Sequence, residues 1–266
     1  MDMIFEADRM PGVGESMDSR ILLTLPGGKG MNTAIAAFRA SRPKPTSGAK
    51  GGDDSSNIRV FMNGAVGDDD FGAKLKTKLE KEGVDISGVR TVENERSGTC
   101  VVIVETDIGD SRNIGYEGAN LKWAPREHHA VECLAGGAKP DLIVAHLGVR
   151  REEVERILES ASRNGVETLL NPSPAVYLVN STYKNLTHLI INETEAALLS
   201  GRKVIELHDL AAWEKTVEDF IHLGVKNVVI TLGEKGAYYA TKDGQEGVVE
   251  AEKNIDVVDT TGAGYV

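Results

Sequence analysis

Short apolar runs alternate with amphipathic stretches along the second half of the chain. Four of these runs have the length and composition of buried strands: LIVAHL at 142–147, ETLLN at 167–171, HLIIN at 188–192 and VVITLG at 228–233. Between the first two, apolar residues recur at three- and four-residue steps over 151–165, which predicts a helix with one apolar face. Strands that alternate with helices in this way predict an α/β fold built on a central, mainly parallel sheet.

In two other parts of the chain, apolar and polar residues alternate with a shorter period. Residues 5–10 with 15–25, and residues 97–120 with a turn at DIGDS (107–111), read as antiparallel strands. They predict a small β element beside the main sheet. The segment 39–57 is rich in Pro, Ser, Gly and Lys, and we expect it to be a disordered surface insertion.

The composition of the chain excludes some classes of binding partner. A chain of 266 residues fits one large domain, or one domain with a small accessory piece. Its net charge of −11 argues against a nucleic-acid partner, and no apolar run approaches the length of a membrane span. The two cysteines, Cys100 and Cys133, form no metal-ligand spacing, and the charged N-terminal residues do not form a secretory signal. We therefore expect a cytoplasmic protein, with the nucleus as a second compartment.

The segment PGGKGMNTAIAAFRA at 26–40 is a glycine turn that opens a helix. It is not a Walker A loop, because Lys29 is followed by Gly30 and not by Ser or Thr. Two interpretations remain open. The turn could serve only to start the helix, or its bare backbone could let a ligand lie close, with Asn32 offering a donor and an acceptor to sugar hydroxyls.

Two acidic stretches allow both a structural and a metal-binding interpretation. In residues 63–85 the cluster Asp68–Asp70 precedes an amphipathic helix, and compensation of the helix dipole is favoured over a metal site. In residues 191–201, Asn192 and Glu195 follow a buried strand. They could cap the next helix, or lie at the ligand-binding edge of the sheet with Glu195 holding Mg²⁺ through water.

Two glycine-rich stretches follow further along the chain. TLGEKGAYY at 231–239 is compatible with a hairpin and with a turn that faces a nucleotide. TTGAG at 260–264 can form a nest of backbone N–H groups at a helix start, which suits a developing phosphoryl charge.

Taken in order, these stretches resemble the PfkB, or ribokinase-like, family of carbohydrate kinases, and within it the ribokinases. The blocks that carry the resemblance are GGKGMN, GAVGDDDFG, SGT with GAN, NPSP, NETEA, TLGEKG and DTTGAG. The resemblance implies an α/β core over 26–95 and 119–266, in which helices cover both faces of the sheet. It also implies a β lid over 1–25 and 96–118 that closes on the sugar. The implied reaction transfers the γ-phosphate of ATP to the 5-hydroxyl of D-ribose.

The resemblance also assigns roles to individual residues. The sugar would be bound by Asp2, Gly27, Gly28, Lys29 and Asn32. ATP would be bound by Asn192, Thr231, Gly233 and Gly236, with Glu195 holding Mg²⁺ through water. A K⁺ ion would be held by Asp259 and by the carbonyl of Thr261, and the anion hole would be formed by Gly262, Ala263 and Gly264. A homodimer through the lid is a further implication.

The chain departs from the family pattern at several points. Tyr265 stands where the family has the Asp that takes the proton from the attacking hydroxyl. A phenol with a pKa near 10 is a poor base at neutral pH, and loss of a general base costs about 10²–10⁴-fold in rate. Gly148 stands where ribokinases carry a sugar-binding Glu. The family also has a strand before Asp2 and helices after Val266, so we expect a chain incomplete at both ends and of low activity.

The sequence also allows other functions. The chain could bind a sugar or a nucleotide without transferring phosphate, or it could phosphorylate another sugar or a nucleoside. A dinucleotide-dependent oxidoreductase is disfavoured, because no GxGxxG follows a first strand.

Overall fold

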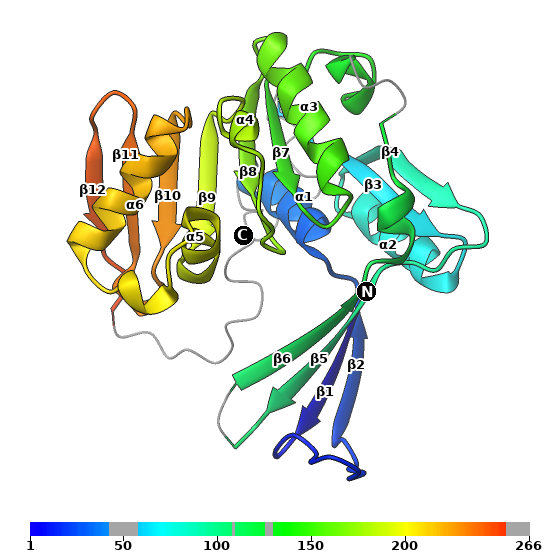
Figure 1. Ribbon diagram of the computed structural model, residues 1–266. Helices are drawn as coiled ribbons and strands as arrows, with labels where there is room; N and C mark the ends of the chain where they lie inside the picture. Colours follow the sequence, from blue (N-terminus) through cyan, green and yellow to red (C-terminus); the bar gives the residue numbers. More distant parts are fainter. Residues whose placement is uncertain (43–57, 108–109, 126–129, 254–266) are drawn as a thin grey trace, which may run out of the picture. The chain divides into compact units, whose positions relative to one another are not determined.

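The computed structural model describes residues 1–42, 58–107, 110–125 and 130–253 of the chain. They form two compact units, whose described residues lie within Met1–Ala124 and Pro125–Val258. Figure 1 shows the elements of each unit with their labels. None of the described helices has the length and apolar content that a membrane span requires.

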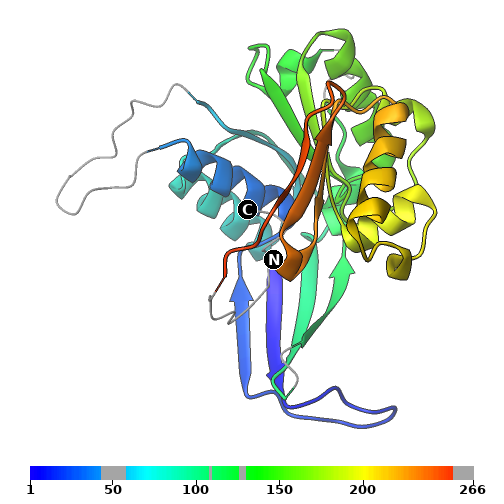
Figure 2. The same ribbon diagram turned by 90° about the vertical axis from the view of Figure 1, so that its left-hand side faces the viewer.

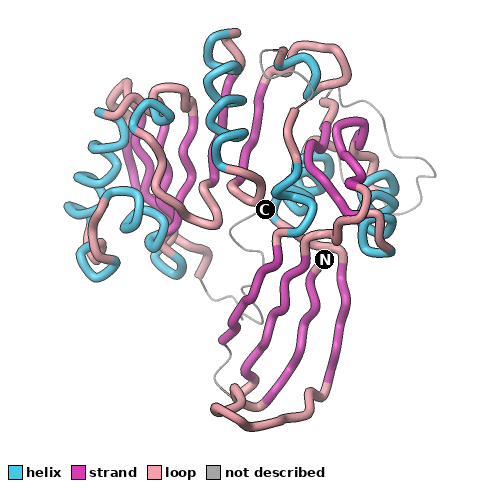
Figure 3. Tube along the Cα trace, turned by 45° about the vertical axis from the view of Figure 1, so that its right-hand side comes forward, coloured by secondary structure: helices cyan, strands magenta, loops and turns pink. Residues whose placement is uncertain are grey.

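The first unit contains a four-stranded sheet with the strand order β2-β1-β5-β6 (Figure 3). Its strands are β1 (Asp2–Ala7), β2 (Ile21–Leu25), β5 (Thr99–Glu105) and β6 (Asp110–Tyr116). The pairs β1/β2 and β5/β6 are antiparallel, as the alternating sequence predicts. The parallel pairing of β1 with β5 joins the two hairpins, and the sequence pattern did not indicate it. The role of this sheet as a lid remains a prediction.

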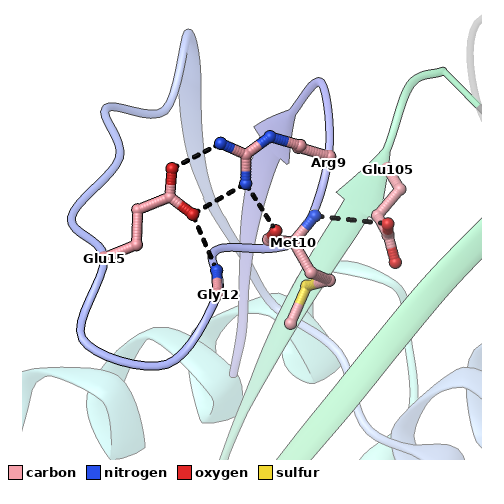
Figure 4. Close-up of polar contacts among 5 residues, drawn as sticks. All are labelled: Arg9, Met10, Gly12, Glu15 and Glu105. Atoms are coloured by element: carbon pink, nitrogen blue, oxygen red, sulfur yellow. Dashed lines mark hydrogen bonds and ion pairs between the residues drawn. The ribbon is translucent and has the colours of Figure 1, made fainter.

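The loop after β1 is held by a small network of polar contacts (Figure 4). Arg9 forms an ion pair with Glu15, and the Gly12 N–H donates to the same carboxylate over 2.8 Å. These bonds, that of Arg9 first, lower the pKa of Glu15 to about 2. The Met10 N–H donates to Glu105 Oε2 over 3.2 Å, so the loop is tied to the end of β5.

The rest of the first unit packs two helices on a pair of parallel strands. Its elements are α1 (Lys29–Ala40), β3 (Phe61–Gly67), α2 (Asp70–Lys81), β4 (Asp85–Val92) and the 3₁₀ helix η1 (Gly118–Lys122). The predicted inward face of α2 is confirmed, since Leu75 and Leu79 are buried with Met31, Ile35 and Val66. Helix α1 continues through Ala40, so it overlaps the start of the expected insertion, and residues 43–57 of that segment lie outside the described residues.

The acidic cluster before α2 serves the helix, as the structural interpretation predicts. Asp69 is the N-cap of α2 and accepts from the Gly72 N–H over 2.8 Å. It also accepts from the N–H and the hydroxyl of Ser97, over 2.9 and 2.6 Å. Within the described ranges, no group of three or more His, Cys, Asp or Glu side chains is placed to hold a metal ion.

We expect Asp69→Ala to lower the free energy of unfolding by about 1–2 kcal/mol at pH 7, because a cap and the bonds to Ser97 are lost. Burial by itself raises the pKa of Asp69, but the bonds from Ser97 and Gly72 outweigh it and hold that pKa below 3.8. The stabilisation is therefore present above 3.8 and is lost as the pH falls through the lowered pKa. Urea unfolding at pH 7 and at about pH 3 measures both effects. Asp70→Ala is the control, and an equal loss in both variants would contradict the capping role.

The second unit is built on a six-stranded sheet with the order β12-β11-β10-β9-β8-β7. The strands are β7 (Leu142–His146), β8 (Glu167–Asn171), β9 (His188–Asn192), β10 (Asn227–Thr231), β11 (Ala237–Thr241) and β12 (Glu246–Val249). Strands β7 to β10 are parallel and correspond to the four predicted runs, while β11 and β12 are antiparallel. The sequence predicted one central sheet, whereas β3 and β4 pair only with each other among the described strands.

Helices α3 (Arg151–Arg163), α5 (Glu193–Ser200) and α6 (Leu210–His222) cover one face of the six-stranded sheet (Figure 2). Shorter helical turns complete the unit: η2 (Val131–Leu134), α4 (Asn180–Tyr183), η3 (Val204–Glu206) and η4 (Gly233–Lys235). Leu158, Leu170, Leu189 and Ile230 lie in the core between the sheet and its helices. The connections bring the carboxyl ends of β7 to β10 to one edge of the sheet.

Candidate functional site

The first group of predicted site residues gathers around one carboxylate at the start of β1. Strand β1 lies between β2 and β5, which places Asp2 opposite Leu25 on one side and Cys100 on the other. After Leu25 the chain turns through Gly27 and Gly28 into α1. The N-terminus of α1 therefore meets the side chain of Asp2.

The two glycines are favoured for different reasons, Gly27 by its contact with Asp2 and Gly28 by its backbone conformation. A Cβ atom on Gly27 would lie 1.9 Å from Asp2 Oδ2, so only a glycine lets the carboxylate touch the turn. Gly28 has φ 105°, a conformation that favours glycine, and its N–H donates to Asp2. We refer to Asp2, Gly27, Gly28 and Lys29 as the β1 carboxylate site.

Burial makes the ionised form of the Asp2 carboxylate less favourable. Burial raises the pKa of Asp2 above 3.8, and the Met1 ammonium, the Lys29 ammonium and the Gly28 N–H only partly oppose that rise. Asn32 lies one turn into α1, where its N–H donates to the Gly28 carbonyl over 3.0 Å. The predicted sugar-binding residues are thus brought together on one strand and one helix N-terminus.

Cys100 lies beside the β1 carboxylate site, and the sequence did not single it out. Burial raises the pKa of its thiol above 9.0, and the nearby Asp2 carboxylate raises it further. Cys100 therefore contributes an uncharged thiol beside Asp2. Only the parallel register of β1 and β5 places it there, and the residues involved are far apart in the sequence.

The second group of residues lies along the carboxyl edge of the six-stranded sheet. His146, Asn171, Asn192 and Thr231 are the last residues of β7, β8, β9 and β10. Ligands of open α/β sheets bind at this edge. Asn192 and Thr231 were predicted there, whereas His146 and Asn171 were not assigned a role.

Asn192 and Glu195 form a capping box at the start of α5. Asn192 Oδ1 accepts from the Glu195 N–H over 2.8 Å, and Glu195 Oε2 accepts from the Asn192 N–H over 3.0 Å. The capping interpretation is therefore confirmed. The carboxylate of Glu195 is buried, with 6% of the residue exposed. A single carboxylate fits Mg²⁺ that takes its other ligands from phosphates and water, as this ion commonly does.

Thr231 ends β10, and Gly233 and Gly236 lie in the turn that leads from β10 to β11. The hairpin interpretation is confirmed, since the two strands are antiparallel and the Leu232 N–H donates to the Gly236 carbonyl over 2.8 Å. Gly233 has φ 56° and Gly236 φ 91°. Both are positive φ angles, which favour glycine at these positions.

We expect Gly236→Ala to destabilise the second unit by about 2–4 kcal/mol, through backbone strain and overpacking. A Cβ atom there would lie 1.9 Å from the Val249 carbonyl oxygen, a backbone atom that cannot rotate away. Gly233→Ala is the matched control, because it also has a positive φ but no described atom within 4 Å of the added Cβ. Thermal unfolding of both variants measures the difference. Equal destabilisation of the two variants would show that the backbone conformation alone, and not the contact with β12, requires glycine at position 236.

The remaining predicted residues of the site lie outside the described residues: Asp259, Thr261, Gly262, Ala263, Gly264 and Tyr265. Their roles as K⁺ ligands, anion hole and base position remain predictions.

Comparison with known proteins settles the family. The pfkB family of carbohydrate kinases matches residues 1–264. The chain belongs to this family. Its fold is accordingly that of the ribokinases, as the resemblance implied, and a kinase activity is the activity of its family.

Individual relatives in the pfkB family act on more than one sugar. The chain is 34% identical to a ribokinase of Schizosaccharomyces pombe, over 99% of the chain and 78% of the relative. It is 32% identical to a deoxyribokinase of Salmonella typhi, over 99% of the chain and 79% of that relative. The structure of Arabidopsis thaliana ribokinase complexed with ribose and ATP superposes with a TM-score of 0.79 at 25% identity, covering 99% of this chain and 78% of that one. These comparisons fix the reaction class but not the sugar.

Proposed function

We propose that the protein transfers the γ-phosphate of ATP to the 5-hydroxyl of a pentose, and that D-ribose is this pentose. The observation that carries the proposal is the Asp2 carboxylate, held against the Gly27–Gly28 turn at the N-terminus of α1. An ionised carboxylate accepts two or more hydroxyl hydrogen bonds, which suits a polyol. The ribokinase relatives support ribose, and the deoxyribokinase relatives make 2-deoxyribose the competing substrate.

The carboxyl edge of the six-stranded sheet is the proposed nucleotide site. We propose that Asn192 and the turn of Thr231, Gly233 and Gly236 bind ATP, and that Glu195 holds the accompanying Mg²⁺ through water. Bound Mg²⁺ would neutralise phosphate charge during transfer. Asp259 and Thr261 are proposed as the ligands of K⁺, with Gly262, Ala263 and Gly264 as donors to the transferred phosphoryl group.

The test is ATP-dependent phosphorylation by the purified chain with Mg²⁺ and K⁺ present. D-ribose and 2-deoxy-D-ribose are supplied separately, and the mass of each sugar product is measured. A phosphorylated ribose formed at a higher kcat/KM than phosphorylated 2-deoxyribose supports the proposal. A preference for 2-deoxyribose would overturn the assignment of the substrate while leaving the reaction class intact.

Tyr265 favours a second candidate, a sugar or nucleotide binder without turnover. Its phenol stands at the family's base position, and a tyrosine side chain is a poor base at neutral pH. A ligand that binds only the folded state raises the unfolding temperature by mass action. Protection by ribose without product would therefore select the binder, whereas product formation would select the kinase.

We also propose that the protein forms a homodimer through the four-stranded sheet and works in the cytoplasm. Leu22 and Ile114 lie on the same face of this sheet and are 54% and 68% exposed. Apolar side chains exposed together on one face commonly mark an interaction surface. Light scattering should give twice the chain mass of 28.6 kDa, and a monomer would contradict the dimer.

A further inference from the structure

The four-stranded sheet joins the rest of the first unit at three connections. They are residues 26–28 between β2 and α1, residues 93–98 between β4 and β5, and Glu117 between β6 and η1. The connection at 93–98 carries a buried side chain, since 1% of Ser97 is exposed. Ser97 therefore lies inside the unit, two residues before β5 begins.

Three hydrogen bonds fix Ser97 against the end of β3 and the start of α2. Its N–H donates to Asp69 Oδ2 over 2.9 Å, and its hydroxyl donates to Asp69 Oδ1 over 2.6 Å. The same hydroxyl accepts from the Gly67 N–H over 3.0 Å. The packing is equally close, because a Cβ atom on Gly67 would lie 2.6 Å from the Ser97 nitrogen. Ser97 is therefore held in place by groups outside the four-stranded sheet.

The residues that follow Ser97 fix the start of β1. The Gly98 carbonyl accepts from the Met1 nitrogen over 3.0 Å, and the Cys100 N–H donates to the Met1 carbonyl over 2.8 Å. These two bonds lead into the parallel pairing in which Asp2 lies opposite Cys100. The backbone of Asp2 is thus connected to Ser97 through Met1.

Asp2 has little freedom to move at the β1 carboxylate site. Its Oδ2 lies so close to the turn that a Cβ atom on Gly27 would be 1.9 Å away, and the Gly28 N–H donates to the carboxylate. Hydrogen bonds weaken steeply when their geometry is disturbed. Burial raises the pKa of Asp2, so its ionised form depends on partners that are correctly placed. A shift of the start of β1 should therefore weaken the acceptor that the proposed function offers to the sugar.

We propose that Ser97 is a positioning residue for sugar binding: it fixes the Asp2 carboxylate through Met1, and Asp69 fixes Ser97 in turn. This inference rests on the proposed function, because it is Asp2 that is proposed to bind the sugar. It gives Asp69 a second role besides the N-cap of α2.

Two substitutions break this link at different atoms. Ser97→Ala removes the hydroxyl that bonds to Asp69 and Gly67. Asp69→Asn can keep Oδ1 as the N-cap acceptor for α2, but it places an NH₂ group opposite the Ser97 N–H, where a donor meets a donor. We expect each variant to raise the dissociation constant for ribose about 10-fold and to change that for a non-hydrolysable ATP analogue less than about 2-fold. Calorimetric titration measures both affinities, and Asp69→Asn carries the test if Ser97→Ala does not fold.

Thr168→Val in the second unit is the matched control. Like Ser97, Thr168 is buried, and its hydroxyl both donates and accepts. It donates to the Asn185 carbonyl over 2.7 Å and accepts from the Thr187 N–H over 2.9 Å. Thermal unfolding should show a loss of stability in Thr168→Val as in Ser97→Ala, because each loses a buried hydroxyl. The control should nevertheless keep the ribose affinity of the parent.

A double-substitution experiment provides a readout that a merely structural role would not change. Ribose affinity is measured in Asp2→Asn with and without Ser97→Ala. If Ser97 acts through the Asp2 carboxylate, Ser97→Ala should cost less than about 2-fold once that carboxylate has been replaced, because both changes disable the same group.

Three results would overturn the inference while leaving the proposed function intact. Parent-like ribose affinity in Ser97→Ala would assign the placement of Asp2 to the packing of Met1, of which 5% is exposed. An undiminished effect of Ser97→Ala in the Asp2→Asn chain would mean that Ser97 acts on ribose by another route. Equal losses of ribose and ATP-analogue affinity would assign Ser97 to the fold alone. A parent chain that binds no ribose would instead overturn the proposed function, and this inference with it.

Discussion

Replacing Asp2 with Asn is expected to weaken ribose binding about 10²-fold while leaving the protein at least as stable as the parent. Hydrogen bonds to a charged group contribute about 1.5–3 kcal/mol each, so loss of the charge weakens every bond to a sugar hydroxyl. The raised pKa of Asp2 means that burial disfavours its ionised form in the folded protein. Asn removes this cost, and its amide oxygen can still accept from the Gly28 N–H.

The same raised pKa gives the effect a pH dependence. A carboxyl whose pKa is raised on folding costs stability at pH values where the unfolded chain is ionised, and that cost disappears as the pH falls through its ordinary value of 3.8. The stability difference between Asp2→Asn and the parent should therefore be larger at pH 7 than at about pH 3.5. Calorimetric titration with ribose and thermal unfolding at both pH values provide the measurements.

The two glycines supply matched controls for this prediction. Gly27→Ala would place its Cβ 1.9 Å from Asp2 Oδ2, so it should displace the carboxylate and reduce ribose affinity. Combining it with Asp2→Asn should add little further loss of affinity, because both changes disable the same group. Gly28→Ala meets no described atom within 4 Å and should act mainly through backbone strain at φ 105°. Unchanged ribose affinity in Asp2→Asn would remove the β1 carboxylate site from the proposed mechanism.

Local sequence patterns predicted the elements that are stabilised by interactions between residues close together in the sequence. ETLLN and HLIIN coincide with β8 and β9, because a short apolar run between turns suits a strand buried in a parallel sheet. Leu75 and Leu79 are four residues apart and pack on the same side of α2. The capping box of Asn192 and Glu195 was likewise readable from residue spacing.

Pairings between distant segments could not be read in this way. The parallel register of β1 with β5 places Cys100 beside Asp2, but nothing in either segment specifies the other as its neighbour. His146 and Asn171 end two strands that were both predicted, yet their hydrogen bond depends on the register between those strands. The sequence thus indicated the candidate site segments, and the register of the strands determined which of their side chains meet.

A substitution of Glu195 offers the second large expected effect, because it can separate the capping role from the proposed Mg²⁺ role. Gln at position 195 can accept from the Asn192 N–H as Glu195 Oε2 does over 3.0 Å, so the capping box should persist. The free energy of unfolding should change by less than about 0.5 kcal/mol. Loss of the carboxylate should weaken the Mg²⁺-dependent part of ATP binding about 10–10²-fold, because bonds to a charged group are the stronger ones. Titration of an ATP analogue with and without Mg²⁺ measures this effect.

Glu195→Ala completes the comparison, since it removes both the charge and the return bond of the capping box. It should weaken Mg²⁺-dependent ATP binding as much as Glu195→Gln does, and should additionally lower the free energy of unfolding by about 1 kcal/mol. A different result would contradict the proposed Mg²⁺ role of Glu195. If Glu195→Gln binds the ATP analogue with parent affinity in Mg²⁺ and only Glu195→Ala is impaired, then Glu195 serves α5 alone. The metal must then be held by other groups, because a neutral amide would have replaced its proposed carboxylate without effect.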